Sequence, residues 1–426
     1  MYIQADTFEN CIRNVIETIS LFTKLGFIIH PKKSSFIPSK QLKMLGFILN
    51  SETMTVSPTE EKLRSVTHLC SQVIQQKHLA IRQVAQVVGK MISCFPGTLY
   101  GPLYYRNVEY DKIFALKTHK GNFDAFMQLS KQSIQELAWW VVNSKQFAKP
   151  LIIQKPCLTI TTDASLNGWG AVCNNEKTGG LWSISEKSNN INYLEMLAIF
   201  FGLKIFAINC TDCHIRIMTD NTTAVSVLTH MGTNHSQSCN PLCKSIWEWC
   251  IFRNIWISVA HIPGKLNVDA DRESRRAHKN STEWMINSDI LKSCLKKFDY
   301  SPNVDLFASR LNRQFQAYVS YTPEPDAFAV DAFTLDWSVY KNYAFPPFSL
   351  IPKILRKLLE DQAQAICILP HWPTQAWYSK AMTMMVGSPV ILQPSQSLLR
   401  LATDSNIVHP LHERLRLIVC HLSGVK

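Results

Sequence analysis

The chain has 426 residues, of which 46% are hydrophobic and 18% are charged, a balance that describes globular cores and excludes a disordered chain. Its 44 Lys and Arg against 32 Asp and Glu give a net charge of +12, which favours polyanions such as nucleic acid as partners. The most apolar run, residues 196–209, is interrupted by Lys204 and is shorter than the roughly 20 residues that a bilayer requires, so we expect no membrane segment. A chain of this length predicts about two to four domains.

The 13 cysteines are odd in number and scattered through apolar surroundings, and no signal peptide is evident. This usage predicts reduced thiols in an intracellular protein of the cytoplasm or the nucleus. Cys210-Thr-Asp-Cys213-His214 matches the Cys-x-x-Cys-His pattern of covalent haem attachment. Cys239 and Cys243 are spaced like two of the four ligands of a zinc site. The short turn around Cys210 leaves little room for haem, and no second pair completes a zinc tetrad at the usual spacing. We therefore predict neither metal nor haem at the cysteines.

Residues 1–57 predict one helix and a hairpin. Apolar side chains recur at three- and four-residue steps over residues 7–26, which is the period of an amphipathic helix. Two short apolar runs, residues 44–49 and 54–56, favour a hairpin. The basic turn between helix and hairpin contains Lys32 and Lys33, which are candidate nucleic-acid contacts.

Residues 58–150 are helical by pattern. Ser57-Pro-Thr-Glu-Glu offers an N-terminal cap and acids in a first turn, and Pro96-Gly ends a second helix. A later helix over residues 132–140 carries the pair Trp139-Trp140. Such a pair can stack on bases, but an aromatic pair on a packed helix more often belongs to a core. Residues 145–156 are interpreted as a linker.

Residues 151–278 alternate between strand and helix patterns. Strands are predicted at residues 158–163, 168–173 and 180–185, with residues 174–180 as a turn. A helix at 192–207, a strand at 214–219, helices at 222–229 and 241–253 and a strand at 255–261 follow. This pattern predicts a mixed α/β domain.

Four acids stand at the ends or starts of these elements: Asp163, Glu195, Asp220 and Asp271. Carboxylates that gather in one place repel each other, and some protonate unless a cation lies among them. Mg²⁺ prefers oxygen ligands, and two such ions about 3.5–4 Å apart hold both oxygens of a phosphoryl displacement. We therefore predict a two-metal nuclease site that holds two Mg²⁺, with Mn²⁺ as an alternative.

Capping and turn roles are the alternative for these acids, because Asp and Asn favour both positions. Asp220 before Asn221 is a plausible helix cap, but four acids in successive elements favour the metal site. Asn167 and Asn221 are predicted to line it. Arg272 and Arg275 follow the last acid on a helix, where they either bind nucleic-acid phosphates or form a solvated face.

Residues 158–276 resemble the type 1 ribonuclease H domain that follows the polymerase in retroelement reverse transcriptases. The sequence Thr-Asp163-Ala-Ser, the Glu195 helix, the strand before Asp220 and the Ala-Asp271 helix start match that domain in order. His261 precedes Asp271 by the interval seen in the family for a mobile histidine, which is thought to help product or metal leave. The resemblance implies hydrolysis of the RNA strand of an RNA–DNA hybrid, with the four acids as metal ligands and His261 as a further catalytic residue.

Residues 1–57 look like the end of a reverse-transcriptase palm, and residues 58–150 look like its thumb or connection helices. In that family a Tyr-x-Asp-Asp turn supplies the polymerase metal ligands, and no Asp-Asp pair occurs in this chain. Polymerase activity is therefore not expected. The sequence from His261 to Arg275 is similar to the retrotransposon version in particular. We interpret the chain as the reverse transcriptase of a tyrosine-recombinase (DIRS-type) retrotransposon, truncated before the Asp-Asp motif.

Residues 279–426 alternate again between strands and helices, with a strand ending at Asp305, the sequence Phe345-Pro-Pro-Phe348, a helix at 350–359 and a strand at 365–370. This order resembles the phage-type adenine-N6 DNA methyltransferase domain of DIRS-type retrotransposons. In that family an Asp or Asn before Pro-Pro accepts hydrogen bonds from the target amino group, which Phe345 cannot do. No glycine-rich cofactor loop follows Asp305. We expect a degenerate methyltransferase-like domain that binds nucleic acid or is a structural relic, and an active methyltransferase is the rival.

The sequence thus predicts an α/β multidomain protein with a ribonuclease H-like mixed sheet and flanking helices, preceded by palm-end and thumb-like helices and followed by a methyltransferase-like α/β unit. Its predicted partners are an RNA–DNA hybrid, DNA or RNA, with no membrane, and the sequence leaves the oligomeric state open. The alternative from a different class is a catalytically inactive nucleic-acid-binding remnant. The enzyme is favoured because no predicted metal-ligand position is substituted.

Overall fold

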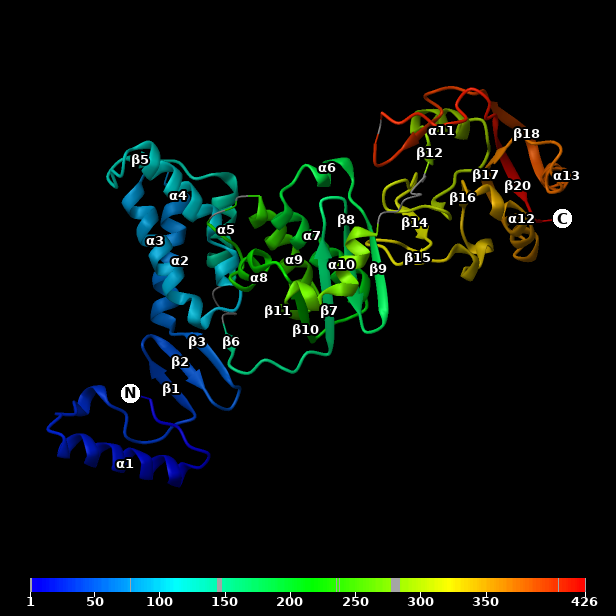
Figure 1. Cartoon of the computed structure of the whole chain (residues 1–426). Helices are drawn as coiled ribbons and strands as arrows, with labels where there is room; N and C mark the ends of the chain where they lie inside the picture. Colours follow the sequence, from blue (N-terminus) through cyan, green and yellow to red (C-terminus); the bar gives the residue numbers. More distant parts are fainter. Residues whose placement is uncertain are drawn as a thin grey trace. The chain divides into compact units, whose positions relative to one another are not determined.

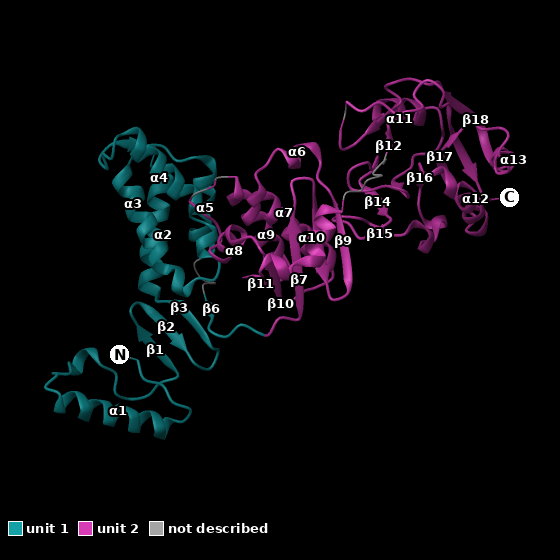
Figure 2. Cartoon of the chain, in the orientation of Figure 1, with its two compact units in different colours: residues 1–154 teal, residues 155–426 magenta. Residues whose placement is uncertain are grey.

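The computed structural model describes residues 2–76, 78–143, 148–234, 236, 238–276, 284–404 and 406–425. The chain divides into two units, residues 1–154 and residues 155–426, which Figure 2 shows in teal and magenta. The predicted boundary between residues 278 and 279 lies outside the described residues, so the division into four domains stays a prediction. No helix in the described part of the chain is long and apolar enough to cross a membrane.

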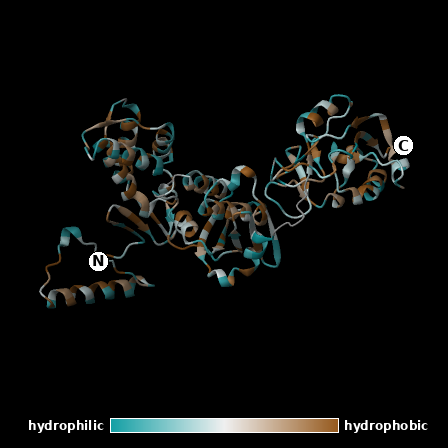
Figure 3. Cartoon of the chain, turned by 45° about the horizontal axis from the view of Figure 1, so that its top comes forward, coloured by the Kyte–Doolittle hydropathy of each residue, from teal (hydrophilic) through white to brown (hydrophobic). Residues whose placement is uncertain are grey.

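The first unit begins with α1 (Phe8–Lys24), which starts where the Thr7 side chain accepts a hydrogen bond from the backbone N–H of Asn10. Hydrophobic and hydrophilic residues alternate along α1 (Figure 3), yet none of its residues is buried. An antiparallel sheet in the order β1-β2-β3-β6 accompanies it. Its strands are β1 (Gln41–Met44), β2 (Phe47–Asn50), β3 (Thr55–Pro58) and β6 (Lys149–Pro150). The predicted helix and hairpin are confirmed, and β6 adds a strand inside the predicted linker.

The rest of the first unit contains α2 (Glu60–Gln75), β4 (Leu79–Ala80), α3 (Ile81–Cys94), α4 (Arg106–Thr118), β5 (Phe126–Met127) and α5 (Lys131–Asn143). α2 and α3 each bury one apolar face, as the periodicity predicts. Trp140 is fully buried, and its indole N–H donates to the Tyr104 carbonyl oxygen at 2.8 Å. Trp140 therefore belongs to the core rather than to a base-stacking surface.

The second unit contains a five-stranded mixed sheet in the order β11-β10-β7-β8-β9 (Figure 1). Its strands are β7 (Leu158–Ala164), β8 (Gly168–Cys173), β9 (Glu176–Leu181), β10 (Cys213–Thr219) and β11 (Ile255–His261). β7, β10 and β11 run parallel to one another, whereas β8 and β9 continue the sheet antiparallel. Because β7 and β10 are parallel neighbours, their carboxyl ends meet at one edge of the sheet.

The helices α6 (Ile184–Lys187), α7 (Ile191–Phe206), α8 (Thr222–Thr229), α9 (Cys239–Phe252) and α10 (Val268–Arg275) accompany this sheet. The strand predicted at residues 180–185 and the turn at 174–180 are wrong. β8 and β9 are joined by a two-residue turn in which Asn174 adopts a φ of 54°, a conformation that Asn tolerates, so β9 starts early. Ser183 accepts a hydrogen bond from the Glu186 backbone N–H and begins α6 where the third strand was expected to continue.

The C-terminal part of the second unit is built on a seven-stranded sheet in the order β15-β14-β13-β16-β17-β20-β18. Its strands are β13 (Val304–Asp305), β14 (Ala317–Ser320), β15 (Ala329–Val330), β16 (Asn342–Ala344), β17 (Gln364–Pro370), β18 (Met385–Leu392) and β20 (Leu417–Ser423). The first five in this order are parallel, and β20 lies antiparallel between β17 and β18. Its other elements are β12 (Trp284–Ile286), α11 (Ser288–Leu295), α12 (Ile351–Glu360), α13 (Tyr378–Thr383) and β19 (Leu399–Leu401). The predicted strand–helix–strand alternation is confirmed.

Arg310 joins this C-terminal part to the five-stranded sheet and its helices. Its guanidinium donates to both carboxylate oxygens of Glu186, at 2.7 and 3.0 Å. The two side chains are 16% and 19% exposed, so the pair is largely shielded from solvent. A second ion pair joins Lys204 at the end of α7 to Asp326 at 2.7 Å. The bidentate Arg310–Glu186 pair fixes the relative orientation of the two segments as well as contributing energy. This agrees with residues 155–426 forming one unit.

Asp305, at the carboxyl end of β13, is a buried carboxyl group that predicts a pH-dependent stability for the C-terminal part. The side chain is 2% exposed and accepts hydrogen bonds from the backbone N–H groups of Phe307 and Gln314, at 3.4 and 3.0 Å. Burial raises the pKa of Asp305 from its ordinary value of 3.8 to about 7. The folded protein therefore binds this proton more tightly than the unfolded chain does. The resulting stabilisation is complete below the unfolded pKa and is lost as pH rises through the folded pKa.

We expect this group to lower the free energy of unfolding of the C-terminal part by up to about 4 kcal/mol between pH 4 and pH 8. That contribution should be missing in Asp305→Asn, whose side chain does not titrate. Amide hydrogen exchange in β13 and β16, followed over this pH range in both proteins, measures the difference. An identical pH dependence in the two proteins contradicts the expectation.

Candidate active site

Three of the four predicted acids come together at the carboxyl edge of the five-stranded sheet. Asp163 lies near the end of β7, Glu195 in the first half of α7, and Asp220 directly after β10. Each offers a carboxylate oxygen, and these oxygens lie within 4.8 Å of one another. Asp163 and Glu195 are each only 4% exposed. The three carboxylates therefore form a compact site, in which Asp163 and Glu195 are shielded from solvent.

The local sequence explains why these acids meet. Parallel pairing of β7 with β10 places Asp163 and the residue after Thr219 at the same edge. α7 begins where the Asn190 side chain accepts a hydrogen bond from the Tyr193 backbone N–H, and this start puts Glu195 over the same edge. Asn221 caps α8 by accepting from the Ala224 backbone N–H, which leaves Asp220 outside the helix and free of the capping role.

Hydrogen bonds from α10 and the residue before it hold the Asp163 carboxylate. The Ser274 hydroxyl donates to one oxygen, and the Asn267 amide lies 3.4 Å from the other. The same Asn267 amide donates to the Thr162 carbonyl oxygen at 3.1 Å, while its own side-chain oxygen is buried without a partner. Glu195 accepts from the Thr219 hydroxyl at 3.4 Å. Asp163 is thus fixed from two sides.

Ser274, Asn267 and Thr219 were not predicted as site residues. The sequence holds a signal for two of them, because Asn267 precedes Asp271 by four residues and Ser274 follows it by three. Residues at these spacings lie on one face of a helix, so polar groups there point the same way as the acid. No comparable signal marks Thr219, whose role depends on the pairing of strands far apart in the sequence.

Burial and mutual repulsion oppose full ionisation of these carboxylates. Burial, followed by the charges of Asp163 and Asp220, raises the pKa of Glu195 to about 8. Burial also raises the pKa of Asp163, with contributions from Asp220 and Asp271 that the Ser274 hydrogen bond partly offsets. A divalent cation among these oxygens would favour their charged forms and reverse both shifts. The residues present therefore fit a cation-binding site.

Asp271, the fourth predicted ligand, lies next to this group but not within it. It is in the first turn of α10 and is 40% exposed. Its carboxylate accepts from the Arg275 side chain, four residues later, at 2.5 Å. Its charge nevertheless contributes to the raised pKa of Asp163, so it is close enough to influence the site. Asp271 is thus paired with Arg275 beside the three-carboxylate group.

His261 ends β11 at the same edge of the sheet. It pairs in register with Thr219, the residue before Asp220, and it is exposed to solvent. The turn that follows it packs against the site, because a Cβ on Gly264 would lie 3.0 Å from a carboxylate oxygen of Asp220. Glycine at this position therefore lets the turn approach Asp220 closely.

The predicted nucleic-acid contacts lie in different surroundings. Asn167 is exposed in the turn between β7 and β8. Besides capping α8, Asn221 donates its side-chain amide to Asn192 at 3.0 Å, so it is tied into the structure at the site's border. Arg272 is 65% exposed and lies 3.6 Å from Asp269. Lys32 and Lys33 are exposed in the first unit, in a short 3-10 helix.

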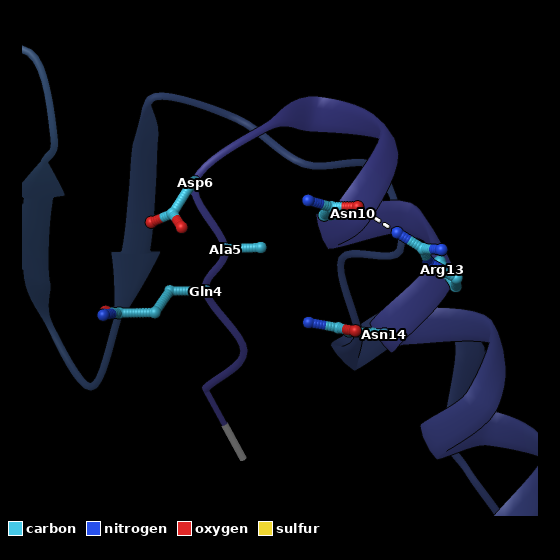
Figure 4. Close-up of a pocket in the computed structure, with 6 residues that line it drawn as sticks. All are labelled: Gln4, Ala5, Asp6, Asn10, Arg13 and Asn14. Carbon is cyan, nitrogen blue, oxygen red and sulfur yellow. Dashed lines mark hydrogen bonds between the residues drawn. The ribbon is translucent and has the colours of Figure 1, made fainter.

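A polar recess in the first unit is a separate feature. Figure 4 shows it between the N-terminal segment and α1. Its lining consists of Gln4, Ala5, Asp6, Asn10, Arg13 and Asn14, with a hydrogen bond from Arg13 to Asn10. Asp6 is the one acid among these residues, so the recess has no set of carboxylates comparable to that around Asp163.

No protein-family model and no curated protein matches the sequence. Among solved structures, the chain is similar to a foamy viral protease-reverse transcriptase in complex with double-stranded DNA, with a TM-score of 0.29 and 12% identity over 60% of this chain and 44% of that one. It is also similar to LC11-RNase H1 in complex with an RNA/DNA hybrid, with a TM-score of 0.26 and 17% identity, and to RNase H1 of Halobacterium salinarum, with a TM-score of 0.25 and 17% identity. Both matches cover 29% of this chain and 98% of the other. Because these scores and identities are low, the function proposed below rests on the residues of this chain.

Proposed function

We propose that residues 151–278 form a metal-dependent nuclease of the ribonuclease H kind, which hydrolyses the RNA strand of RNA–DNA hybrids. The observation that carries the proposal is the convergence of Asp163, Glu195 and Asp220 at one edge of the sheet. Carboxylate oxygens are the hard ligands that Mg²⁺ and Mn²⁺ prefer. The raised pKa values of Asp163 and Glu195 support a site that is completed by positive charge.

In this proposal each residue of the site has its own role. Asp163, Glu195 and Asp220 would hold the metal, and Asp271 is proposed as a fourth ligand at the more exposed side. Two bound Mg²⁺ would supply activation of water and stabilisation of the leaving 3′ oxygen. Ser274 orients the Asp163 carboxylate by donating to it. His261, exposed at the same edge, is proposed to assist turnover.

Three features support a nucleic-acid substrate. The net charge of +12 favours polyanions in general. Asn167, Arg272 and Arg275 are exposed on the turn and the helix that border the acids, where they can contact phosphates or sugars. The order of the acids in the chain resembles ribonuclease H, and discrimination in favour of RNA would come from hydrogen bonds to its 2′-hydroxyl groups.

Cleavage of a labelled RNA–DNA hybrid by the purified full chain tests this function. The RNA strand should be cut in Mg²⁺ and left intact in EDTA, and Asp220→Asn should abolish cutting. Asp269→Asn is a matched control, because Asp269 is a half-exposed acid on α10 that pairs with Lys177 at 2.7 Å. The rival, an inactive nucleic-acid-binding remnant, predicts binding of the hybrid without cleavage. Undiminished cutting by Asp220→Asn would overturn the assignment.

Mg²⁺ should also stabilise the folded protein. A ligand at about 100 times its Kd adds roughly 2.7 kcal/mol when it binds only the folded state. We expect Mg²⁺ to raise the Tm of the second unit in the wild-type chain but not in Glu195→Gln, which keeps the shape of Glu195 and lacks its charge. Calorimetry in EDTA and in Mg²⁺ measures both shifts, and an equal response of the two proteins argues against metal binding at this site.

We further propose that the C-terminal part is a degenerate relative of adenine-N6 methyltransferases and that the whole chain derives from a DIRS-type reverse transcriptase. The parallel sheet with one antiparallel strand, β20, next to its edge strand supports the first of these. Phe345 follows β16 at the position where the family needs a hydrogen-bond acceptor, so methyl transfer is not expected. Incubation with labelled S-adenosylmethionine and DNA should give no labelled adenine. A labelled product would instead support the rival hypothesis, an active methyltransferase.

A further inference from the structure

Two connections of the C-terminal sheet contact the five-stranded part of the second unit. They are residues 306–316, between β13 and β14, and residues 321–328, between β14 and β15. Arg310 lies in the first connection, and Pro323 and Asp326 lie in the second. Their partners lie on or beside β9, α6 and α7: Thr178, Leu181, Glu186, Phe201 and Lys204. These partners do not include the acids of the candidate active site, so the contacts are separate from it.

Arg310 bridges three segments of the five-stranded part. Its guanidinium binds both carboxylate oxygens of Glu186 in α6 and also donates to the Leu181 carbonyl oxygen, at the end of β9, at 3.0 Å. It lies 4.8 Å from the centre of the Phe201 ring in α7. A planar guanidinium can bind a carboxylate at two points and lie against an aromatic ring, whereas the ammonium group of lysine is a single charged point. Arg310 therefore holds β9, α6 and α7 at the same time.

The first two contacts hold the chain on both sides of Trp182. Leu181 comes directly before this tryptophan. The Glu186 carboxylate also accepts a hydrogen bond from the backbone N–H of Ser183, the residue directly after the tryptophan, at 2.7 Å. Arg310 thus fixes the segment that places Trp182, whose side chain is fully buried.

Trp182 in turn holds the turn that follows Asp163. Its indole N–H donates to the Ser165 carbonyl oxygen at 2.9 Å, and its backbone N–H donates to the Asn167 carbonyl oxygen at 3.1 Å. The Ser165 hydroxyl donates to the Ser274 carbonyl oxygen at 2.7 Å, and the Ser274 hydroxyl donates to the Asp163 carboxylate. These contacts link the C-terminal part to the Asp163 carboxylate.

The contact with Phe201 reaches the helix that carries Glu195. Phe201 follows Glu195 by six residues in α7 and is buried. Its ring packs against Trp182, with 5.8 Å between the ring centroids. The ion pair between Lys204 and Asp326 attaches the same helix at a further point. Because a helix moves as a rigid element, fixing its second half also fixes the position of Glu195.

We propose that Arg310 is a positioning residue for the candidate metal site and that residues 306–316 and 321–328 form an intramolecular brace for it. The brace holds β9 and α7 so that Asp163 and Glu195 lie together before a cation arrives. Because gathered carboxylates repel one another, holding the elements that carry them reduces the cost of assembling the site when metal binds. This role deepens the proposed nuclease function and rests on it.

Hydrogen exchange of the full chain in EDTA tests the brace without metal or substrate. In Arg310→Ala, the amides of residues 164–168 and of α7 should exchange faster than in the wild type, because their attachment to the C-terminal part is lost. Arg356→Ala is the matched control: Arg356 is an exposed arginine on α12, and its removal should leave both segments protected. Arg310→Lys keeps the charge but not the two-point pair, so its exchange should be intermediate, and it carries the comparison if Arg310→Ala misfolds. Wild-type protection of both segments in the folded Arg310 variants would overturn the proposal.

Mn²⁺ titration by calorimetry measures the expected consequence for the metal site. Arg310→Ala should raise the Kd of Mn²⁺ by about tenfold, the low end of the effect of removing groups that orient metal ligands. A simple loss of stability would lower Tm but leave the Mn²⁺ affinity of the folded protein unchanged. At saturating Mg²⁺ the cleavage rate and the KM for the hybrid should return to wild-type values, because the bound ion then also holds the acids together.

These measurements separate failure of the brace from failure of the proposed function. Equal Mn²⁺ affinity of the wild type and Arg310→Ala would overturn the brace and leave the nuclease assignment intact. A wild-type chain that binds no Mn²⁺, or that binds it and leaves the hybrid uncut, would overturn the proposed function. The exchange rates in EDTA would still decide whether Arg310 holds α7 and residues 164–168.

Discussion

Asp163→Asn should lower the rate of hybrid cleavage by about 10³-fold or more, the largest effect on activity that we expect from one substitution. The change removes a carboxylate that is 4% exposed and is one of the proposed metal ligands. It preserves side-chain shape, so the loss should not come from unfolding. Single-turnover cleavage of a labelled hybrid at saturating protein separates the chemical step from binding.

Groups that act as one unit are not additive, so Asp163→Asn combined with Asp220→Asn should be no slower than either alone. Asp269→Asn, which removes an acid of the same charge from the exposed face of α10, should cleave at the wild-type rate. A rate for Asp163→Asn within tenfold of the wild type, or a double variant much slower than both singles, would show that these acids do not share one metal site.

Gly170→Ala should have the largest effect on the stability of the site. A Cβ at this position in β8 would lie 2.2 Å from the carbonyl oxygen of Ala270 and 2.7 Å from the backbone nitrogen of Ser274. Backbone atoms cannot move aside as a flexible side chain can, so α10 must shift away from the sheet. We expect a loss of about 1–3 kcal/mol in the free energy of unfolding, typical of overpacking.

The same shift should reduce cleavage, because Ser274 and Asn267 would withdraw from the Asp163 carboxylate. Gly89→Ala is the matched control: Gly89 lies in α3 with open space around its Cα, and alanine is the better helix former by up to about 1 kcal/mol. Hydrogen exchange in β8 and α10, measured beside the cleavage rate, follows both effects. Normal protection and activity in Gly170→Ala would mean that close packing of α10 on β8 is not required.

The strands and helices of the five-stranded part could be predicted largely from periodicity. Residues 222–229 and 255–261 were placed at the observed bounds, because each segment is bordered by clear turn or capping residues. The order of the acids along the chain also indicated a shared site, and three of the four meet. The prediction failed between residues 174 and 187, where a two-residue turn and a capping Ser183 decide the structure and apolar alternation does not.

What could not be predicted depends on contacts between segments far apart in the sequence. The Asp271 side chain pairs with Arg275 and is not among the three acids whose oxygens converge. The hydrogen bond from Ser274 to Asp163 joins residues 111 positions apart.

Occupancy of the acid cluster by a divalent ion is the most direct measurement of the central claim. Crystals of the protein soaked in Mn²⁺ would reveal bound ions by their anomalous scattering. We predict an anomalous peak coordinated by carboxylate oxygens of Asp163, Glu195 and Asp220, and its loss in Asp163→Asn. Crystals that bind Mn²⁺ elsewhere, or that show no peak among these three carboxylates at millimolar Mn²⁺, would contradict a metal-dependent nuclease at this site.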